Sequence, residues 1–435
     1  MCYAIPGKII DVIGKSALID YFGEKKEAYV DVEGVNPGDY VFAQGGVIIE
    51  RLDEDIALSI LSGWNEAFFK LKEIDRRLAE EEFVSNSDDS KIIEIIDKAE
   101  NGLSLTKDEV LSLLRIKGEK ELDFLYKAAN RIRQKVHKNS SCVHGIIEFS
   151  NICKNDCYYC GIRRDNHSLE RYRMETDEIL DVVTSSNRNL GFRAFVLQSG
   201  EDGYYTTERL AEIIRKIKER SSVLLFISIG EREKECYSEL YKAGARGVLF
   251  RFETSNPDLH GRFHTTLQYE NRLRILRELK DIGYIISTGS LIGLPGQKEE
   301  DILDDILFAS SLEPEMYSFG PFIPHPDTPL AIAPKVDIDM MLKVIAVTRL
   351  VRHDGNILVT SALEKLFGIE GTRRTLMTGG NSMMVNLTPP KYRRLYSIYP
   401  GKGEGNDDTR KRISDTVALL QSLGRAPMDI GMKHL

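Results

Sequence analysis

From residue 145 to residue 387, eight short apolar runs alternate with longer amphipathic segments. The runs are Gly145–Ser150, Ala194–Gln198, Val223–Ser228, Val248–Phe252, Tyr284–Thr288, Met316–Phe319, Ile357–Thr360 and Met383–Leu387. Segments with helical periodicity, such as Thr207–Glu219 and Asn271–Leu279, lie between them. Strands that alternate with helices form parallel sheets, and eight such units close into a barrel. The sequence therefore predicts an α/β fold, a complete (β/α)8 barrel.

Two further parts precede this alternation. Residues 1 to about 60 contain short β-rich runs between turns, which predicts a small all-β, OB-like barrel of five strands. An amphipathic helix follows to about residue 81, and a helix start with a capping box is predicted at Thr106 and Glu109. We expect a small barrel plus helix at 1–82, a linker at 83–91, and a barrel with N-terminal helices at 92–435.

The composition restricts the class of protein. The chain has six cysteines in 435 residues, a net charge of −8 and no apolar run long enough to span a bilayer. A cytoplasmic location with reduced thiols is therefore expected. The negative charge argues against nucleic acid or an anionic membrane as a partner.

Three cysteines follow the first strand of the expected barrel. Cys153, Cys157 and Cys160 have C-x3-C-x2-C spacing. Three thiolates ligate three irons of a [4Fe–4S] cubane and leave the fourth iron open to a small ligand. A Cys3His zinc site would need His144 or His167, whose spacing is unlike that of paired zinc ligands. The motif therefore predicts one iron–sulfur cluster.

Polar residues recur where the predicted strands end, which is the end at which barrel enzymes carry their active sites. They are Gln198, Ser199, Gly200, Glu201 and Asp202 after the second strand, Ser228 at the third, Arg251 and Glu253 at the fourth, Thr288 and Ser290 at the fifth, and Thr360 and Ser361 at the seventh. We expect these side chains to surround the cysteine loop.

The cysteine motif, with Tyr159 before its last cysteine, resembles the signature of radical S-adenosylmethionine (SAM) enzymes. In that superfamily SAM binds the open iron, and one electron splits it into methionine and a 5′-deoxyadenosyl radical. From about residue 92 the chain looks like HydE, the radical SAM maturase of [FeFe]-hydrogenase. The matching stretches are 146–151, 161–166, 172–174, 196–202, 253–257, 291–297, 320–329 and 392–401.

The resemblance to HydE implies roles for individual residues. It implies that Cys153, Cys157 and Cys160 hold the cluster and that Arg272 clamps the SAM carboxylate. Further SAM contacts are expected from Tyr159, Gln198, Ser199, Gly200, Glu201, Ser228 and Glu253. Residues implied to line the substrate cavity are Arg251, Thr360, Ser361, Met384 and Tyr396, with Met383 as the alternative to Met384. A structural ion pair at the barrel rim is the other interpretation of Glu253 and Arg272.

Some positions depart from the HydE pattern. Phe252 stands where the family often has histidine, which leaves a changed substrate open. Residues 402–408 contain no cysteine where some members carry a second cluster, so one cluster is predicted. Cys142 and Cys236 are interpreted as free thiols.

Residues 1 to about 75 resemble a second family, the HypC-type chaperone of [NiFe]-hydrogenase assembly, through residues 1–8, 37–41 and 51–54. That resemblance implies that Cys2 binds an iron carrying cyanide and carbon monoxide. The family usually has a histidine near position 44, where this chain has Gln44. The alternative is that the domain docks a partner or packs on the barrel.

The two resemblances imply a radical SAM enzyme in metal-centre assembly. The implied substrate is an organometallic iron precursor with a cysteine-derived ligand, and the implied partners are hydrogenase-maturation proteins and an electron donor such as ferredoxin or flavodoxin. A small amino acid is the alternative substrate, because the barrel is more distantly similar to methylornithine synthase and biotin synthase. A third hypothesis is a non-catalytic iron–sulfur scaffold.

Overall fold

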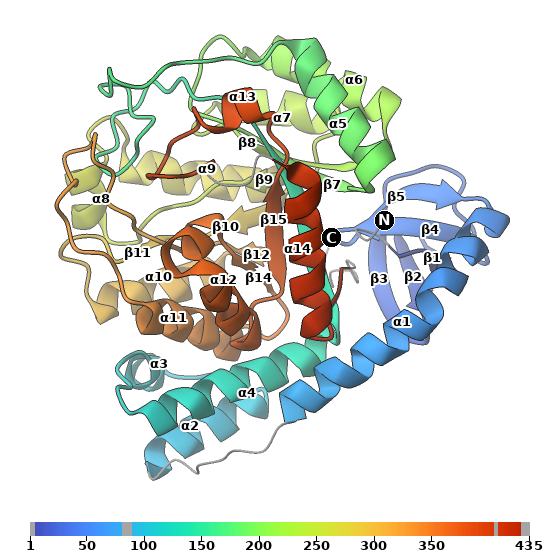
Figure 1. The fold of residues 1–435 in the computed structure, drawn as a ribbon, viewed down its shortest axis with the longest axis horizontal. Helices are drawn as coiled ribbons and strands as arrows, with labels where there is room; N and C mark the ends of the chain where they lie inside the picture. Colours follow the sequence, from blue (N-terminus) through green and yellow to red (C-terminus); the bar gives the residue numbers. More distant parts are fainter. Residues whose placement is uncertain (1–4, 81–88, 404–407, 428–435) are drawn as a thin grey trace.

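The computed structural model describes residues 5–80, 89–403 and 408–427. Their chain forms two closed barrels of different size (Figure 1). The small one has strand order β1-β2-β3-β5-β4, and β1 pairs with β4 to close it. Its strands are β1 (Gly7–Ile13), β2 (Ser16–Tyr21), β3 (Glu24–Val30), β4 (Tyr40–Gln44) and β5 (Val47–Leu52). The predicted five-stranded barrel is thus confirmed.

The large barrel contains eight parallel strands, and its last strand pairs with its first. The strands are β6 (Ser140–Ser150), β7 (Ala194–Ser199), β8 (Leu224–Ser228), β9 (Gly247–Leu249), β10 (Ile285–Thr288), β12 (Met316–Tyr317), β14 (Asn356–Val359) and β15 (Ser382–Asn386). This confirms the predicted (β/α)8 barrel. Three shorter strands are β16 (Ala426–Pro427), which pairs with β6, and the separate pair β11 (Leu291–Ile292) and β13 (Gly320–Pro321).

The strand bounds differ from the predicted ones mainly at β6 and β9. β6 begins at Ser140, before the predicted Gly145, because its first residues pair with β15 and β16. β9 ends at Leu249 rather than Phe252, because the amides of Phe252 and Glu253 both reach the carbonyl of Gly289. The fourth strand therefore leaves the regular ladder where the predicted site residues begin.

Helices surround the large barrel. They are α5 (Thr176–Leu190), α6 (Thr207–Arg220), α7 (Lys234–Lys242), α8 (Pro257–Phe263), α9 (Tyr269–Ile282), α10 (Glu299–Ser311), α11 (Ile338–Val351), α12 (Ser361–Met377), α13 (Pro390–Arg393) and α14 (Thr409–Ser422). Before them, α2 (Ser90–Glu100), α3 (Lys107–Leu114) and α4 (Glu119–His137) lie below the barrel in Figure 1. The predicted capping box of Thr106 and Glu109 is present at the start of α3.

The small barrel covers the N-terminal end of the large barrel's strands. Phe42 and Val47 of the small barrel share one apolar cluster with Leu224 and Phe226, which lie on β8. The Arg193 guanidinium lies 4.4 Å from the centroid of the Phe42 ring. Barrel active sites lie at the C-terminal end of the strands, so the small domain packs on the end of the barrel that contributes to stability rather than to catalysis.

Helix α1 (Glu54–Glu80) joins the two barrels. Its residue Asp75 is 1% exposed, and one carboxylate oxygen lies 2.8 Å from a guanidinium nitrogen of Arg133 and 2.8 Å from one of Arg425. Both arginines are fully buried. A buried charge needs such partners, so the second half of α1 is anchored to the large barrel.

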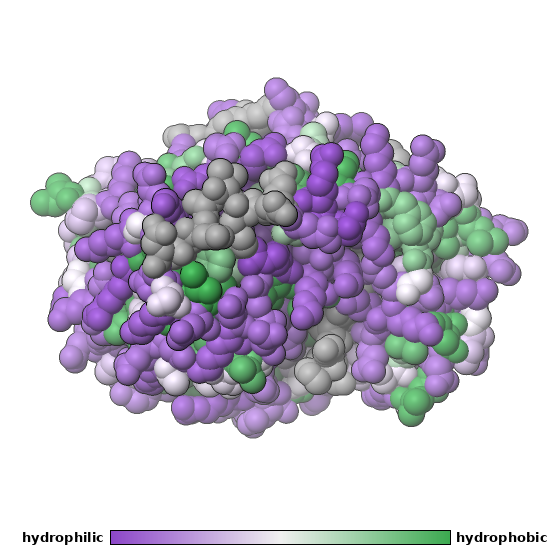
Figure 2. Space-filling model, turned by 90° about the horizontal axis from the view of Figure 1, so that it is seen from below, coloured by the Kyte–Doolittle hydropathy of each residue, from purple (hydrophilic) through white to green (hydrophobic). Residues whose placement is uncertain are grey.

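No helix within the described ranges is long and apolar enough to cross a membrane. On the face seen from below, hydrophilic residues predominate and apolar residues lie scattered among them (Figure 2), as on ordinary protein surfaces.

Candidate active site

Cys153, Cys157 and Cys160 line one cavity of about 250 Å³ at the C-terminal end of the large barrel. Burial raises the pKa of Cys157 well above its usual value and that of Cys160 to about 12, and the neighbouring thiols act in the same direction. Thiolates therefore need a positive partner in this cavity, which iron supplies. Within the described residues, no three His, Cys, Asp or Glu side chains are grouped as a single metal ion requires. A [4Fe–4S] cubane does not require its ligands to converge on one ion, because each of the three thiolates binds a different iron.

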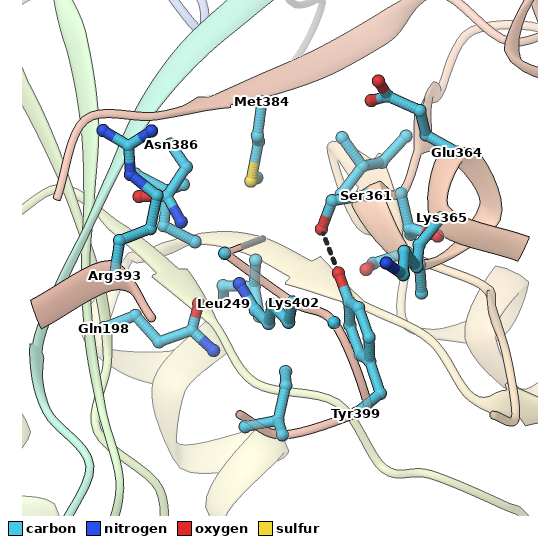
Figure 3. A pocket seen from close by; sticks show the side chains of 18 of the residues that line it. Gln198, Leu249, Ser361, Glu364, Lys365, Met384, Asn386, Arg393, Tyr399 and Lys402 are labelled. Carbon is cyan, nitrogen blue, oxygen red and sulfur yellow. Dashed lines mark hydrogen bonds between the residues drawn. The ribbon is translucent and has the colours of Figure 1, made fainter. Parts of the chain in front are cut away.

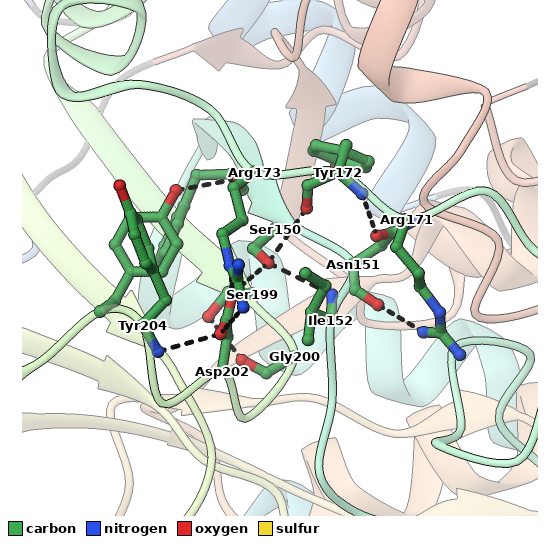
Figure 4. A network of polar contacts seen from close by, with 12 residues as sticks. Ser150, Asn151, Ile152, Arg171, Tyr172, Arg173, Ser199, Gly200, Asp202 and Tyr204 are labelled. Carbon is green, nitrogen blue, oxygen red and sulfur yellow. Dashed lines mark hydrogen bonds and ion pairs between the residues drawn. The ribbon is translucent and has the colours of Figure 1, made fainter.

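A polar network around the buried carboxylate of Asp202 fixes the start of the cysteine loop (Figure 4). The Ser150 hydroxyl donates to a carboxylate oxygen of Asp202 at 2.8 Å, and Arg173 forms a two-pronged ion pair with the same carboxylate at 2.7 and 2.9 Å. The amide of Tyr204 donates to Asp202 at 3.0 Å. The ends of β6 and β7 are thereby joined beside the cysteines.

Arg171 holds the rest of the loop. Its guanidinium donates to the carbonyls of Asn151, Ile162, Arg163 and Asn166 at 2.6 to 3.0 Å. A planar fork with five donors suits such convergent carbonyls. The sequence interpretation assigned no role to Arg171 or Arg173, and it included Asp202 only among the polar residues at the end of the second strand. Arg173 and Asp202 lie in stretches that resemble HydE, and Arg171 directly precedes one, but no motif identifies their hydrogen-bond partners.

The cradle around Cys153 fits a cluster. A Cβ on Gly200 would lie 2.3 Å from the carbonyl oxygen of Ile152 and 2.9 Å from the Cβ of Cys153, so only glycine permits this approach. The amide of Glu201 lies 3.4 Å from the Cys153 sulfur and donates to it. Amide donors to cluster sulfurs are a common device for stabilising iron–sulfur centres.

Charged groups surround the open side of the cavity. Arg272, 8% exposed, donates to the carbonyl of Arg251 at 2.7 Å and to Glu231 at 3.2 Å, and it lies 4.6 Å from the ring centroid of Phe250. These contacts fix the orientation of the guanidinium. Glu201 in turn accepts from the amide of Glu231 at 2.7 Å. A clamped guanidinium of this kind can bind a carboxylate.

Glu253 has an unusual backbone. Its φ of 69° lies in the left-handed region, which costs a non-glycine residue about 1 kcal/mol or more. Its carboxylate forms an ion pair with Arg251 at 3.0 Å, and Arg272 is paired with Glu231. The alternative of structural ion pairs is therefore realised in part, although Arg251, Glu253 and Arg272 also line the cavity. Strain of this type is typical of functional sites.

A second cavity of about 340 Å³ lies deeper in the barrel and adjoins the first (Figure 3). Both cavities are lined by Gln198, Leu249, Arg251, Ala362, Ile398 and Tyr399. Thr360, Ser361 and Met384 line the deeper cavity, whereas Met383 packs in the apolar core. The Ser361 and Tyr399 hydroxyls are 2.8 Å apart. A reactive species formed in the first cavity would thus be separated from a molecule in the second by no more than the residues that the two cavities share.

Lys402 closes one side of the deeper cavity. Its ammonium pairs with the fully buried carboxylate of Glu148, which also accepts from the amide nitrogen of Asn386 at 2.9 Å. Lys402 also lies 5.4 Å from the ring centroid of Tyr396. The residue therefore connects the chain after α13 to the first barrel strand. Sequence reasoning noted this region only for its lack of cysteines.

Most of the residues predicted from sequence come together around the two cavities. Tyr159, Gln198, Ser199, Gly200, Glu201, Ser228, Glu253, Arg272 and Tyr396 line the first cavity, and Arg251 lines both. Cys2 lies outside the described residues. Cys142 and Cys236 are buried, and neither forms a disulfide within the part of the chain that the structure describes.

Three other residues lie away from the cysteines. His167 is exposed. His144 points into the closed end of the barrel, where its ring stacks on Phe226 at 5.4 Å. Neither histidine therefore completes a zinc site with the three cysteines. Phe252 packs edge-on against Phe308 at 4.9 Å and lines neither cavity, so its difference from the family leaves the cavity wall unchanged.

Comparison with known proteins agrees with this geometry. The model of the radical SAM superfamily matches residues 147–309, and the model of the HupF/HypC family matches residues 1–64. The [FeFe] hydrogenase maturase subunit HydE of Thermotoga maritima is 40% identical over 77% of this chain and 95% of its own length. The 3-methylornithine synthase of Methanosarcina acetivorans is 29% identical over 76% of this chain and 93% of its own.

Solved structures show the same barrel. Methylornithine synthase (PylB) superposes with a TM-score of 0.69 at 26% identity and covers 77% of this chain and 97% of its own. The [FeFe]-hydrogenase maturase HydG superposes with a TM-score of 0.62 at 20% identity, which shows the fold alone. The chain therefore belongs to the HydE family of radical SAM enzymes, which use a [4Fe–4S] cluster and SAM, and it carries an N-terminal domain of the HupF/HypC type.

Proposed function

We propose that this enzyme cleaves SAM reductively in the outer cavity and directs the radical at an organometallic iron substrate in the inner one, as a step in the assembly of a hydrogenase metal centre. The observation that carries the proposal is the continuity of the two cavities. Residues such as Gln198 and Arg251 line both, while all three cysteines line only the outer one.

Different residues of the chain bind the cluster and SAM. Cys153, Cys157 and Cys160 hold the cluster, which when bound supplies one electron to SAM and yields methionine and the 5′-deoxyadenosyl radical. Arg272 binds the carboxylate of SAM through a guanidinium already fixed by Glu231 and the Arg251 carbonyl. The run Gln198–Glu201, with Tyr159, Ser228 and Glu253, completes the SAM site. Because these groups are held by the fold, little reorganisation accompanies binding.

The inner cavity holds the substrate. Arg251, Thr360, Ser361 and Met384 provide one charge, two hydroxyls and a thioether around it, and Tyr396 adds a phenol on the side of the outer cavity. The Nε of Arg251 is buried without a hydrogen-bond partner in the described structure. An unsatisfied buried guanidinium nitrogen is costly, and an anionic or cyanide-bearing substrate would satisfy it.

Two relationships support the link to hydrogenase. One is the 40% identity to a maturase subunit over nearly its whole length, and the other is the HupF/HypC-type domain on the same chain. We expect a low-potential donor such as ferredoxin or flavodoxin, other maturation proteins as partners, and a cytoplasmic location. Covalent linkage raises the concentration of one domain near the other.

The packing of the small domain bears on its role and favours the structural alternative. Gln44, at the position where the family usually has histidine, is only 2% exposed and lies at the end of β4. The neighbouring face packs on the large barrel. We propose that the domain is a fixed part of the enzyme, and that Cys2 is its candidate ligand for an iron carrying cyanide and carbon monoxide.

The test is anaerobic reconstitution with iron and sulfide, followed by SAM and dithionite, with and without a synthetic iron carbonyl–cyanide cysteine complex. We expect 5′-deoxyadenosine from the wild type, its loss in Cys157→Ala, and retention in Cys236→Ala, which removes a buried thiol of α7. The complex should change the rate of SAM cleavage or give a new radical signal. A wild type that forms no 5′-deoxyadenosine would support the scaffold hypothesis instead.

Similarity to methylornithine synthase, which covers 76% of this chain, favours a second candidate, a radical reaction on a small amino acid. Incubation with lysine or thiol-bearing amino acids and analysis of the products would distinguish the two. Conversion of an amino acid without any effect of the iron complex would favour this candidate.

A further inference from the structure

A short segment after α8 holds the cysteine loop from the side opposite Arg171. The amide of Tyr158 donates to the carbonyl of Phe263 at 3.0 Å. The amide of Asp156 donates to the Thr266 hydroxyl at 3.2 Å, and the Thr265 hydroxyl donates to the carbonyl of Asp156 at 3.3 Å. The residues between Cys153 and Cys160 are therefore fastened to residues 263–266, which we call the clasp.

The clasp also holds one side chain of the loop. The Tyr159 hydroxyl lies 2.7 Å from Nε2 of His264, and the two rings meet edge to face with centroids 5.3 Å apart. Nδ1 of His264 lies 3.0 Å from the carbonyl oxygen of His260. A carbonyl only accepts, so Nδ1 carries the proton and Nε2 is the acceptor. The phenol of Tyr159 therefore donates to His264.

The surroundings keep the His264 ring neutral. His264 is 2% exposed, and its pKa lies well below the ordinary value because of burial first, and then because of His260 and Arg272. The His260 ring stacks on it with centroids 4.1 Å apart. The ring nitrogens of His260 itself have no partner in the described structure. His264 is thus a fixed acceptor, and His260 contributes the flat surface behind it.

Tyr159 connects the clasp to the site, because it lines the outer cavity together with Cys157, Cys160 and Arg272. A tyrosine held at its hydroxyl has one ring orientation, while a free one can turn about its side-chain bonds. The same stretch of chain that carries His264 continues into α9, which carries Arg272. The stretch of chain from the clasp to α9 thus positions both the Tyr159 ring beside the cluster ligands and the Arg272 guanidinium beside the outer cavity.

We propose that His264 is a positioning residue for SAM cleavage: by accepting the hydrogen bond of Tyr159 it fixes the wall of the outer cavity against which SAM binds. This proposal rests on the assignment of the cluster and SAM to this cavity, and it does not depend on the identity of the substrate.

The test compares His264→Phe, Tyr159→Phe and the double variant, all reconstituted anaerobically. Each single variant loses the same hydrogen bond, so each should raise the KM for SAM about tenfold with a much smaller change in kcat. The double variant should be no worse than either single one, because the bond is lost only once. In the electron paramagnetic resonance spectrum of the reduced cluster, the change caused by SAM should require correspondingly more SAM.

His260→Phe is the matched control, because it keeps an aromatic ring in the stack and removes no hydrogen bond of the side chain. It should match the wild type in KM and in the spectrum. Tyr159→Phe removes a single oxygen and so tests the bond even if His264→Phe folds poorly. Additive losses in the double variant, or a wild-type KM in Tyr159→Phe, would overturn the proposal. Absence of SAM cleavage in the wild type would instead refute the proposed function.

Discussion

The guanidinium of Arg251 lies 3.0 Å from the carboxylate of Glu253 at the boundary between the two cavities. Both residues follow β9, at the point where the chain leaves the regular ladder and Glu253 takes a positive φ. The irregular backbone therefore brings a cation and an anion to the place where SAM and substrate would meet. Because Arg251 and Glu253 form an ion pair, a substitution of either residue tests whether SAM cleavage and substrate conversion take place in different cavities.

Arg251→Met should separate SAM cleavage from the reaction of the substrate. A hydrogen bond to a charged group contributes about 1.5–3 kcal/mol, so substrate conversion should fall by about one to two orders of magnitude. Formation of 5′-deoxyadenosine should fall much less. The measurement is the ratio of 5′-deoxyadenosine to product, with Arg188→Met, an exposed residue of α5, as the control. Equal losses of both products would show that Arg251 acts through Glu253 on the SAM site.

Gly200→Ala should weaken the cluster. Its Cβ would collide with the backbone carbonyl of Ile152, and backbone gives way less easily than a flexible side chain. We expect less iron per chain after reconstitution and faster bleaching of the cluster by a chelator. Gly203→Ala is the matched control, because no atom lies within 4 Å of the Cβ it would add. If both variants bind iron like the wild type, the close approach at Gly200 is not required.

His144 should make the apo-protein sensitive to acid. Burial lowers its pKa to about 4 in the folded state, below the unfolded value of about 6.5. The unfolded chain therefore binds more protons between these values, and the stability contributed by the neutral form is lost as the pH falls from about 6.5 to 4. His144→Phe should reduce that loss by up to about 3 kcal/mol.

The measurement is urea unfolding of the apo-protein at several pH values, with His167→Phe, an exposed histidine, as the control. His144→Phe keeps a ring against Phe226, so its stability near pH 7 should change little. Parallel pH profiles for His144→Phe and the wild type would mean that His144 does not titrate with unfolding.

Asp75→Asn should loosen the anchoring of α1. It leaves the buried guanidinium groups of Arg133 and Arg425 without their compensating carboxylate. Removal of one partner of a buried ion pair costs about 3–5 kcal/mol, so a clearly lower Tm is expected. Glu73→Gln, on the same helix and exposed with its partner Arg76, should have almost no effect. Similar Tm values for Asp75→Asn and the wild type would show that α1 is held by apolar contacts alone.

The sequence predicted the architecture well, because each barrel strand is an apolar run whose neighbours along the chain are also its neighbours in space. The cysteine spacing and the strand-end residues Gln198, Ser228 and Arg251 were accessible for the same reason. Prediction stopped at residues whose hydrogen-bond partners no periodicity or motif identifies, whether they are nearby backbone carbonyls, as for Arg171, or a distant side chain, as for His264. Arg171 reads as an ordinary surface charge until its carbonyl partners are known, and His264 was not singled out at all.

The amino-acid sequence by itself determined the chemistry of this protein: three thiolates at cluster spacing, a barrel to hold them and a second domain in front. Only the tertiary structure decided how that chemistry is arranged. In the folded chain Arg251 lines both cavities and Phe252 lies outside them. The small domain packs on the N-terminal end of the large barrel, and His264 lies within hydrogen-bond distance of Tyr159. The local sequence specifies motifs and the periodicity that forms strands and helices. The relationships named above depend on packing between segments, which no local pattern encodes.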